Sequence, residues 1–396
     1  MEQIKTDRHV PALDGVRGLA ILGVLMSHFV PALADAFGTT WARELVRYAG
    51  FGAWGVDLFF VLSGFLITGI LLDTRESPDY WRSFFGRRAL RIFPLYYVFL
   101  VGLYLTNPPA REPWTFWLHL SNWRADLGIS SNIYTWHFWS LAIEEQFYFV
   151  WPIVVGLRPI RRIGPICLTV ALGSVVAQGV AAWSGAGIET LHRMTPLALD
   201  GLAIGSYLAW VDRYQRARAA QLARLALPAL LASAIAIDQL GAISPAIMVV
   251  GRAIASLGAG AIVVLAVAGP APVGRLLACQ PLRMLGKYCY GLYLLHPIIV
   301  VKGITQTRWF VVHLPSWMLP FAWIASLIGG LAASLVLARL SWRLIESPCL
   351  SLKRFFPYRP APTGLPSRPH IGLARASGPL NLVAMADRET DSARES

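Results

Sequence analysis

Two basic side chains in the first apolar segment, Arg17 and His28, lie eleven residues apart. On an α-helix this spacing is about three turns, so both side chains fall on one face, about 16 Å apart along the axis. Asp14 lies one turn before Arg17 and can pair with it. An ionisable group costs about 2.5–3.5 kcal/mol at the centre of a membrane-spanning helix, so such groups normally face a bundle interior or a wet cavity. The spacing therefore predicts a helix face that points inward, toward a site of chemistry.

A carboxylate near the start of the second apolar segment, Asp57, lies level with His28 if the two segments cross a membrane in opposite directions. Carboxylates commonly orient the imidazoles of catalytic or metal-ligating histidines. Asp57 can therefore hold or charge-balance His28. An interfacial aspartate without a chemical role explains the position alone equally well.

The fourth apolar segment contains two adjacent carboxylates, Glu144 and Glu145. Glu144 shares one helix face with His137, Ser140 and Tyr148. Glu145 is displaced by about 100° around the helix. A structural ion pair with an arginine of another segment accounts for one carboxylate, whereas a second one requires a polar cavity.

Three arginines, Arg87, Arg88 and Arg91, open the third apolar segment. Most such clusters only set the topology of a membrane protein. A phosphate-binding site is the alternative, because the guanidinium fork binds phosphate through two hydrogen bonds. Arg88 and Arg91 are three residues apart and share a helix face.

Two further positions border these segments. Trp136 ends a long loop that is rich in Trp, His and Asn. The simplest explanation of these tryptophans is an aromatic belt at the membrane interface, and stacking against a sugar is the alternative. His296 lies in the ninth apolar segment, and a lone histidine there is typically satisfied within the core.

The elements that must position these side chains are membrane helices. Of the 396 residues, 56% are apolar and 14% are charged, and apolar runs of about 20 residues, the length that crosses a bilayer, recur throughout. The sequence predicts an all-α polytopic membrane protein with about ten spans. These are residues 11–31, 53–72, 89–106, 138–157, 163–183, 194–211, 222–240, 245–268, 284–302 and 318–340.

The net charge of +13 does not indicate nucleic-acid binding, because Lys and Arg collect in alternate loops. The positive-inside rule then places both termini in the cytoplasm. The four cysteines have no metal-ligand spacing, so we expect no metal site. We expect a transmembrane domain over residues 1–350 and a disordered cytoplasmic tail over 351–396, which is rich in proline and then polar.

In combination, these motifs resemble the acyltransferase 3 family of integral-membrane acyltransferases. The resemblance extends over residues 10–350 and rests on six blocks of sequence. They are the Arg17–ten residues–His28 pattern, residues 59–65, residues 87–97, residues 140–148, residues 290–296 and residues 346–348.

The resemblance implies transfer of an acyl group, commonly acetyl, from cytoplasmic acyl-CoA to a hydroxyl of a glycan-type acceptor or macrolide, in the inner membrane of a bacterium. His28 would act as the general base or as a covalent acyl relay. Arg17 would stabilise the thioester oxygen. Asp57 or Glu144 would hold the His28 tautomer, and Glu145 would be a further catalytic carboxylate. The donor phosphates would be bound by Arg87, Arg88 and Arg91. The acceptor would be bound by Trp136, His137 and Tyr148.

A transporter or flippase for a lipid-linked or small polar substrate is the second functional class. Ionisable residues within spans also mark transport pathways. The sequence lacks the inverted repeats or paired broken helices that are typical of transporters. Acyl transfer or acyl-CoA hydrolysis by the purified protein would distinguish the two classes.

Overall fold

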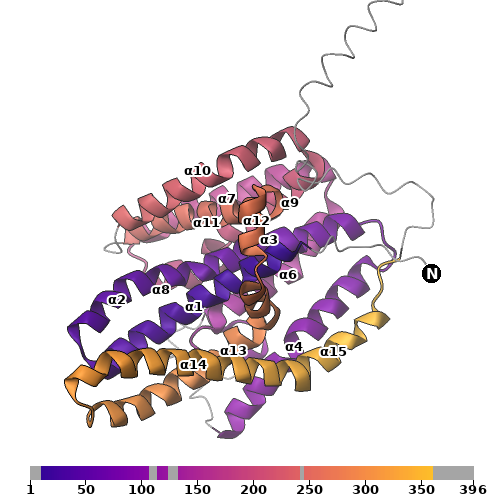
Figure 1. Cartoon of the computed structure of the whole chain (residues 1–396). Helices are drawn as coiled ribbons and strands as arrows, with labels where there is room; N and C mark the ends of the chain where they lie inside the picture. The colour runs from indigo at the N-terminus through magenta and orange to yellow at the C-terminus, as the bar shows by residue number, and fades with distance from the viewer. Residues whose placement is uncertain (1–9, 107–113, 124–132, 241–244, 360–396) are drawn as a thin grey trace, which may run out of the picture.

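The computed structural model describes residues 10–106, 114–123, 133–240 and 245–359, and within these ranges the chain is helical and has no strands. Helices of adjacent sequence run back and forth as a bundle (Figure 1). The long helices are α1 (Pro11–Phe37), α3 (Gly55–Thr74), α4 (Tyr80–Thr106), α6 (Phe138–Leu157), α7 (Ile160–Trp183), α9 (Asp200–Tyr214), α10 (Arg216–Leu240), α11 (Pro245–Ala268), α13 (Gln280–Val311) and α14 (Leu319–Ser341). Shorter helices are α2 (Thr40–Gly50), α5 (Trp114–Trp117), α8 (Ile188–Arg193), α12 (Ala271–Leu277) and α15 (Ser347–Ser351).

Seven helical stretches of the described residues are long and apolar enough to cross a membrane. The other three predicted spans correspond to α6, α9 and α10. In α6 the Glu144-Glu145-Gln146 run lowers the mean hydropathy, and α9 has only 15 residues, fewer than the about 20 that a bilayer requires. The all-helical fold is confirmed for the described residues, with seven candidate membrane-spanning stretches where the sequence predicted about ten.

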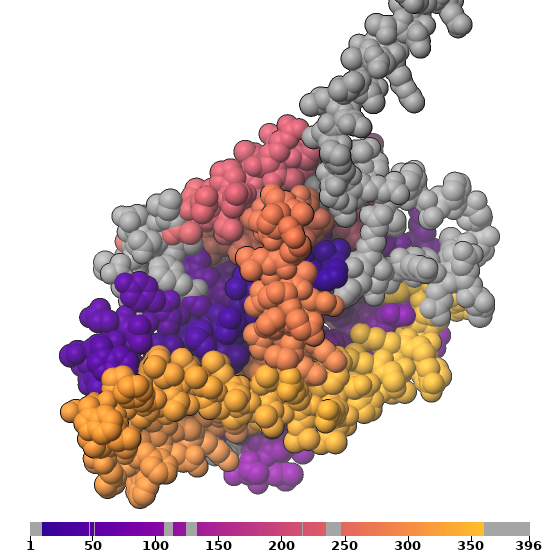
Figure 2. Space-filling view, in the orientation of Figure 1, coloured from indigo at the N-terminus to yellow at the C-terminus, as the bar shows by residue number. Residues whose placement is uncertain are grey.

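The outer surface of the bundle is apolar. On α7, Leu168, Leu172, Val176 and Val180 follow one another at intervals of four and are 47–67% exposed. Figure 2 shows α10 and α14 at opposite edges of one face, with α12 between them. An exposed stripe of this kind would promote aggregation in water, whereas it suits contact with lipid chains.

Glycines allow α1 and α13 to approach closely. A Cβ atom on Gly286 would lie 1.9 Å from the carbonyl oxygen of Asp14, and one on Gly18 would lie 1.9 Å from that of Leu282. Small residues at such positions let helix backbones pack in a membrane. The close approach matters for the site, because α1 and α13 carry His28 and His296.

Replacing Gly286 by alanine is expected to separate α1 from α13 and to destabilise the protein by about 1–3 kcal/mol, as overpacking does. Gly303→Ala on the same helix is the matched control, because a Cβ there meets nothing within 4 Å. The measurement is the thermal unfolding midpoint of each variant purified in detergent. Equal midpoints for the two variants would contradict the close packing.

The chain after α15 folds back on the start of α4. Arg359 forms a two-pronged ion pair with Asp79, which lowers the pKa of that carboxyl through hydrogen bonding. The Ser83 hydroxyl donates to the Pro357 carbonyl at 2.6 Å. The predicted tail therefore begins with an ordered segment, residues 351–359, and the rest of it, 360–396, lies outside the described residues.

Candidate active site

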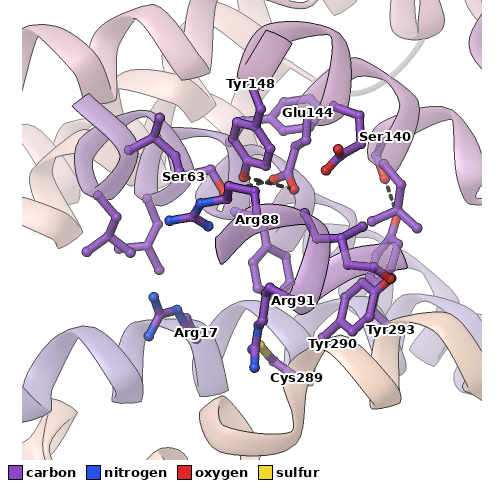
Figure 3. A pocket seen from close by; sticks show the side chains of 18 of the residues that line it. Arg17, Ser63, Arg88, Arg91, Ser140, Glu144, Tyr148, Cys289, Tyr290 and Tyr293 are labelled. Carbon is purple, nitrogen blue, oxygen red and sulfur yellow. Dashed lines mark hydrogen bonds between the residues drawn. The ribbon is translucent and has the colours of Figure 1, made fainter. Parts of the chain in front are cut away.

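A cavity of about 210 Å³ lies inside the bundle, and polar side chains from five helices border it (Figure 3). Its polar lining combines cations, carboxylates and hydroxyls. The residues are Arg17 from α1, Ser63 from α3, Arg88 and Arg91 from α4, Ser140, Glu144, Glu145 and Tyr148 from α6, and Cys289, Tyr290 and Tyr293 from α13. Apolar side chains of α3, including Phe59 and Leu66, complete the wall.

The cationic part of the cavity consists of three arginines. Arg17 donates to Asp14 at 2.8 Å, as the sequence spacing predicted. The Arg88 guanidinium lies 5.5 Å from the centre of the Tyr148 ring. The Arg91 guanidinium lies 5.8 Å from the Trp342 ring, at the end of the last long helix. Three guanidinium groups on one cavity make it a candidate site for an anion.

Arg87 is directed elsewhere. Its Nε donates to the Phe356 carbonyl at 2.6 Å, and its guanidinium lies 5.1 Å from the Tyr358 ring. Successive helix positions differ in direction by about 100°, which explains why Arg87 and Arg88 face different surroundings. Of the three arginines that the sequence grouped together, only Arg88 and Arg91 line the cavity.

Both adjacent carboxylates border the cavity. Glu144 accepts a hydrogen bond from Ser63 at 2.9 Å and another from Tyr148 at 3.3 Å. Glu145 lines the same space although it is turned away from Glu144 along the helix. The cavity thus extends around α6 far enough to border two of its faces, and it supplies the polar surroundings that two buried carboxylates need.

His28 lies in a cluster of histidine and tryptophan side chains. Its Nδ1 lies 2.9 Å from Nε2 of His296, and its ring centre lies 4.4 Å from the Trp136 ring. The His137 ring lies 5.3 Å from the His296 ring. His296 thus has a specific partner on another helix, which the sequence did not indicate.

One layer of hydroxyl groups lies between the cavity and this cluster. The hydroxyls of Ser140 and Tyr293 are 2.5 Å apart, and both residues line the cavity. The Tyr293 hydroxyl also donates to the His137 carbonyl at 3.1 Å. Tyr293 therefore lines the cavity and also contacts the imidazoles, because its ring lies 5.2 Å from that of His137 and 6.1 Å from that of His296.

Asp57 has a different partner from the one that the sequence suggested. Its carboxylate lies 3.6 Å from Nε of Arg252, a buried arginine on α11. Asp200 lies 4.0 Å from the same nitrogen and accepts a hydrogen bond from Ser256. His28 is hydrogen-bonded to His296, whereas Asp57 pairs with Arg252 and Glu144 accepts hydrogen bonds from Ser63 and Tyr148. No motif or spacing in the sequence pointed to Arg252.

Removing Arg252 by substitution with methionine is expected to destabilise the protein by about 3–5 kcal/mol, because it leaves buried carboxylates without their cation. Arg193→Met is the control. Arg193 pairs with Glu189, whose side chain is 64% exposed, and such pairs contribute about 0–1 kcal/mol. Thermal unfolding in detergent measures both variants. A small loss for Arg252→Met, equal to that of the control, would show that the buried pair is dispensable.

Comparison with known proteins supplies the family. The family model described as an acyltransferase domain matches residues 10–339. Relatives include the putative peptidoglycan O-acetyltransferase YrhL of Bacillus subtilis, 29% identical over 86% of this chain and 55% of that protein. The peptidoglycan O-acetyltransferase OatA of Listeria monocytogenes is 28% identical over 86% of this chain and 56% of its own length. The O-acetyltransferase OatA of Staphylococcus aureus is 27% identical over 88% of this chain and 58% of its own length.

The chain spans little more than half the length of these curated relatives. No solved structure matches it. The family match covers most of the chain and includes α1, α3, α4, α6 and α13, the helices that build the cavity. The chain belongs to the acyltransferase 3 family of membrane acyltransferases.

Proposed function

We propose that this protein is a multi-pass enzyme of the bacterial inner membrane that transfers an acyl group, acetyl in the first instance, from cytoplasmic acyl-CoA to a hydroxyl of a cell-surface glycan. One observation carries the proposal: Tyr293 lines the arginine-bearing cavity and also lies next to the His28–His296 pair, with its ring centre 6.1 Å from that of His296. Because two of the relatives are named peptidoglycan O-acetyltransferases, peptidoglycan is the first acceptor to test.

The donor is proposed to enter from the cytoplasm. In the ten-span arrangement with both termini cytoplasmic, the arginine-rich start of α4 faces that side. Arg88 and Arg91 then bind the donor phosphates. Arg17 joins them, because about 16 Å along α1 separates it from His28, too far to act on a carbonyl beside that imidazole. This replaces the thioester-oxygen role that the sequence suggested for Arg17.

The same separation favours a donor of particular shape. Its anionic groups and its reactive carbonyl must lie far apart and be joined by a narrow arm. Acyl-CoA has this architecture, with phosphates at one end and the thioester at the other. Glu144 and Glu145, together with Tyr148, can accept and donate hydrogen bonds along an amide-bearing arm.

The chemistry assigned to His28 is general base catalysis. Its imidazole takes the proton from the acceptor hydroxyl as the oxygen attacks the thioester carbonyl carbon, the carbon–sulfur bond breaks, and the leaving CoA thiolate takes the proton from the His28 imidazolium. Trp136 contacts His28, and His137 contacts both Trp136 and His296; these two residues are proposed to hold the acceptor sugar. An acyl-histidine relay is the variant in which His28 itself first takes the acyl group.

The test uses protein reconstituted in liposomes, with radiolabelled acetyl-CoA and soluble peptidoglycan fragments. Labelled glycan is the expected product. Movement of the fragments across the bilayer, without transfer of label or hydrolysis of acetyl-CoA, would instead support a transporter. Quenching after addition of donor alone separates the two chemical variants, because only the relay leaves label on His28.

A further inference from the structure

We propose that His296 is a positioning residue that fixes the tautomer of His28 and so leaves the Nε2 lone pair of His28 free to act as the base. The inference rests on the proposed function, and it assigns a role to a side chain that would otherwise be counted as a core packing residue. His296 is fully buried on α13, and the separation of the two histidines in sequence is 268 residues.

The geometry of the pair is that of a well-aligned hydrogen bond. The two imidazole planes differ by only 4°, and their centres are 5.0 Å apart. The bonded nitrogens are 2.9 Å apart. The rest of the distance between the ring centres is about the sum of the two distances from each centre to its own nitrogen, so the two nitrogens lie nearly on the line that joins the centres. The rings therefore meet edge to edge, and the bond lies close to both ring planes.

The backbone decides which nitrogen carries the hydrogen. Nδ1 of His296 lies 3.0 Å from the Leu292 carbonyl oxygen and 2.8 Å from that of Tyr293. Carbonyl oxygens only accept hydrogen bonds, so this Nδ1 must be the protonated nitrogen of a neutral ring. Its Nε2 is then an acceptor, and the hydrogen in the shared bond belongs to Nδ1 of His28. The Nε2 of His28 is left without a hydrogen.

This arrangement does what a carboxylate does in a catalytic triad, but without a charge. A carboxylate beside the imidazole would add an anion within the span, and buried ions are costly there. The chain instead orients His28 through a neutral ring that is itself held by main-chain carbonyls of α13. Asp57 remains committed to Arg252.

The test compares His296→Gln with His296→Leu. Glutamine can present an amide oxygen to the Nδ1–H of His28, whereas leucine cannot accept a hydrogen bond. We expect His296→Leu to lower kcat at least about 10-fold, with KM for acetyl-CoA unchanged within about twofold, and His296→Gln to recover a substantial part of kcat. His313→Leu is the control, since His313 makes a similar contact with the Trp309 carbonyl but is exposed.

A direct readout of the tautomer accompanies the kinetics. Nitrogen-15 spectra of histidine-labelled protein, with the His28 signals assigned by their loss in His28→Ala, are expected to show Nδ1 protonated and Nε2 free. The His296→Leu variant should lose this preference. A protonated Nε2 in the unmodified protein, or equal kcat for the Leu and Gln variants, would overturn the inference. If the unmodified protein transfers acetyl and only His28→Ala is inactive, the proposed function stands while the role of His296 falls.

Discussion

Replacing His28 by alanine is expected to lower kcat for acyl transfer by about 10²–10⁴-fold, the range over which a positioned general base contributes. The variant should still bind acetyl-CoA, because the arginines that are proposed to hold the phosphates lie on the other side of the Ser140–Tyr293 layer. Donor affinity measured by calorimetry and initial rates measured with labelled acetyl-CoA separate these two effects.

Two outcomes would contradict this account of His28. Transfer at an undiminished rate would remove His28 from the chemistry altogether. Loss of donor binding together with rate would show that His28 contributes to the donor site. Unfolding midpoints in detergent establish whether the variant is folded, and the exposed His313→Ala serves as the control for loss of a histidine.

Replacing Arg88 by alanine is expected to weaken binding of acetyl-CoA by about 10–100-fold, because a charge-assisted hydrogen bond contributes about 1.5–3 kcal/mol. The effect should appear mainly in KM. Arg87→Ala is a matched control from the neighbouring position. Its guanidinium contacts the Phe356 carbonyl and the Tyr358 ring, so its loss should leave donor affinity nearly unchanged.

The comparison is informative because charge alone does not separate these variants. Both remove one positive charge from the start of the same helix. If surface charge attracted the donor, the two substitutions would weaken binding equally, and they would do so less at high salt. Equal losses for Arg87→Ala and Arg88→Ala would therefore contradict a phosphate site inside the cavity.

Local periodicity predicted the parts of the site that lie on one helix. The pairing of Arg17 with Asp14 follows from their spacing of three residues and is confirmed. The shared face of Ser140, Glu144 and Tyr148 is present at the cavity for the same reason. Arg88 lines the cavity but Arg87 does not, because neighbouring residues on a helix point in different directions.

Partners on different helices could not be predicted. The bonds from His28 to His296 and from Asp57 to Arg252 join α1 to α13 and α3 to α11, and they depend on which helices pack together. That packing is set by backbone approaches such as Gly286 against Asp14, which a single sequence does not reveal. A carboxylate was the expected partner for His28 because carboxylates commonly have that role. The structure provides a second histidine instead.

The most direct test is a cryo-electron microscopy structure of the protein with a non-reactive thioether analogue of acetyl-CoA. We expect the analogue's phosphates to lie within hydrogen-bond distance of Arg88 and Arg91, the Ser140 and Tyr293 hydroxyls to have moved apart, and the acyl end to lie beside Nε2 of His28. An analogue bound outside the cavity, or one whose acyl end points away from His28, would contradict this expectation.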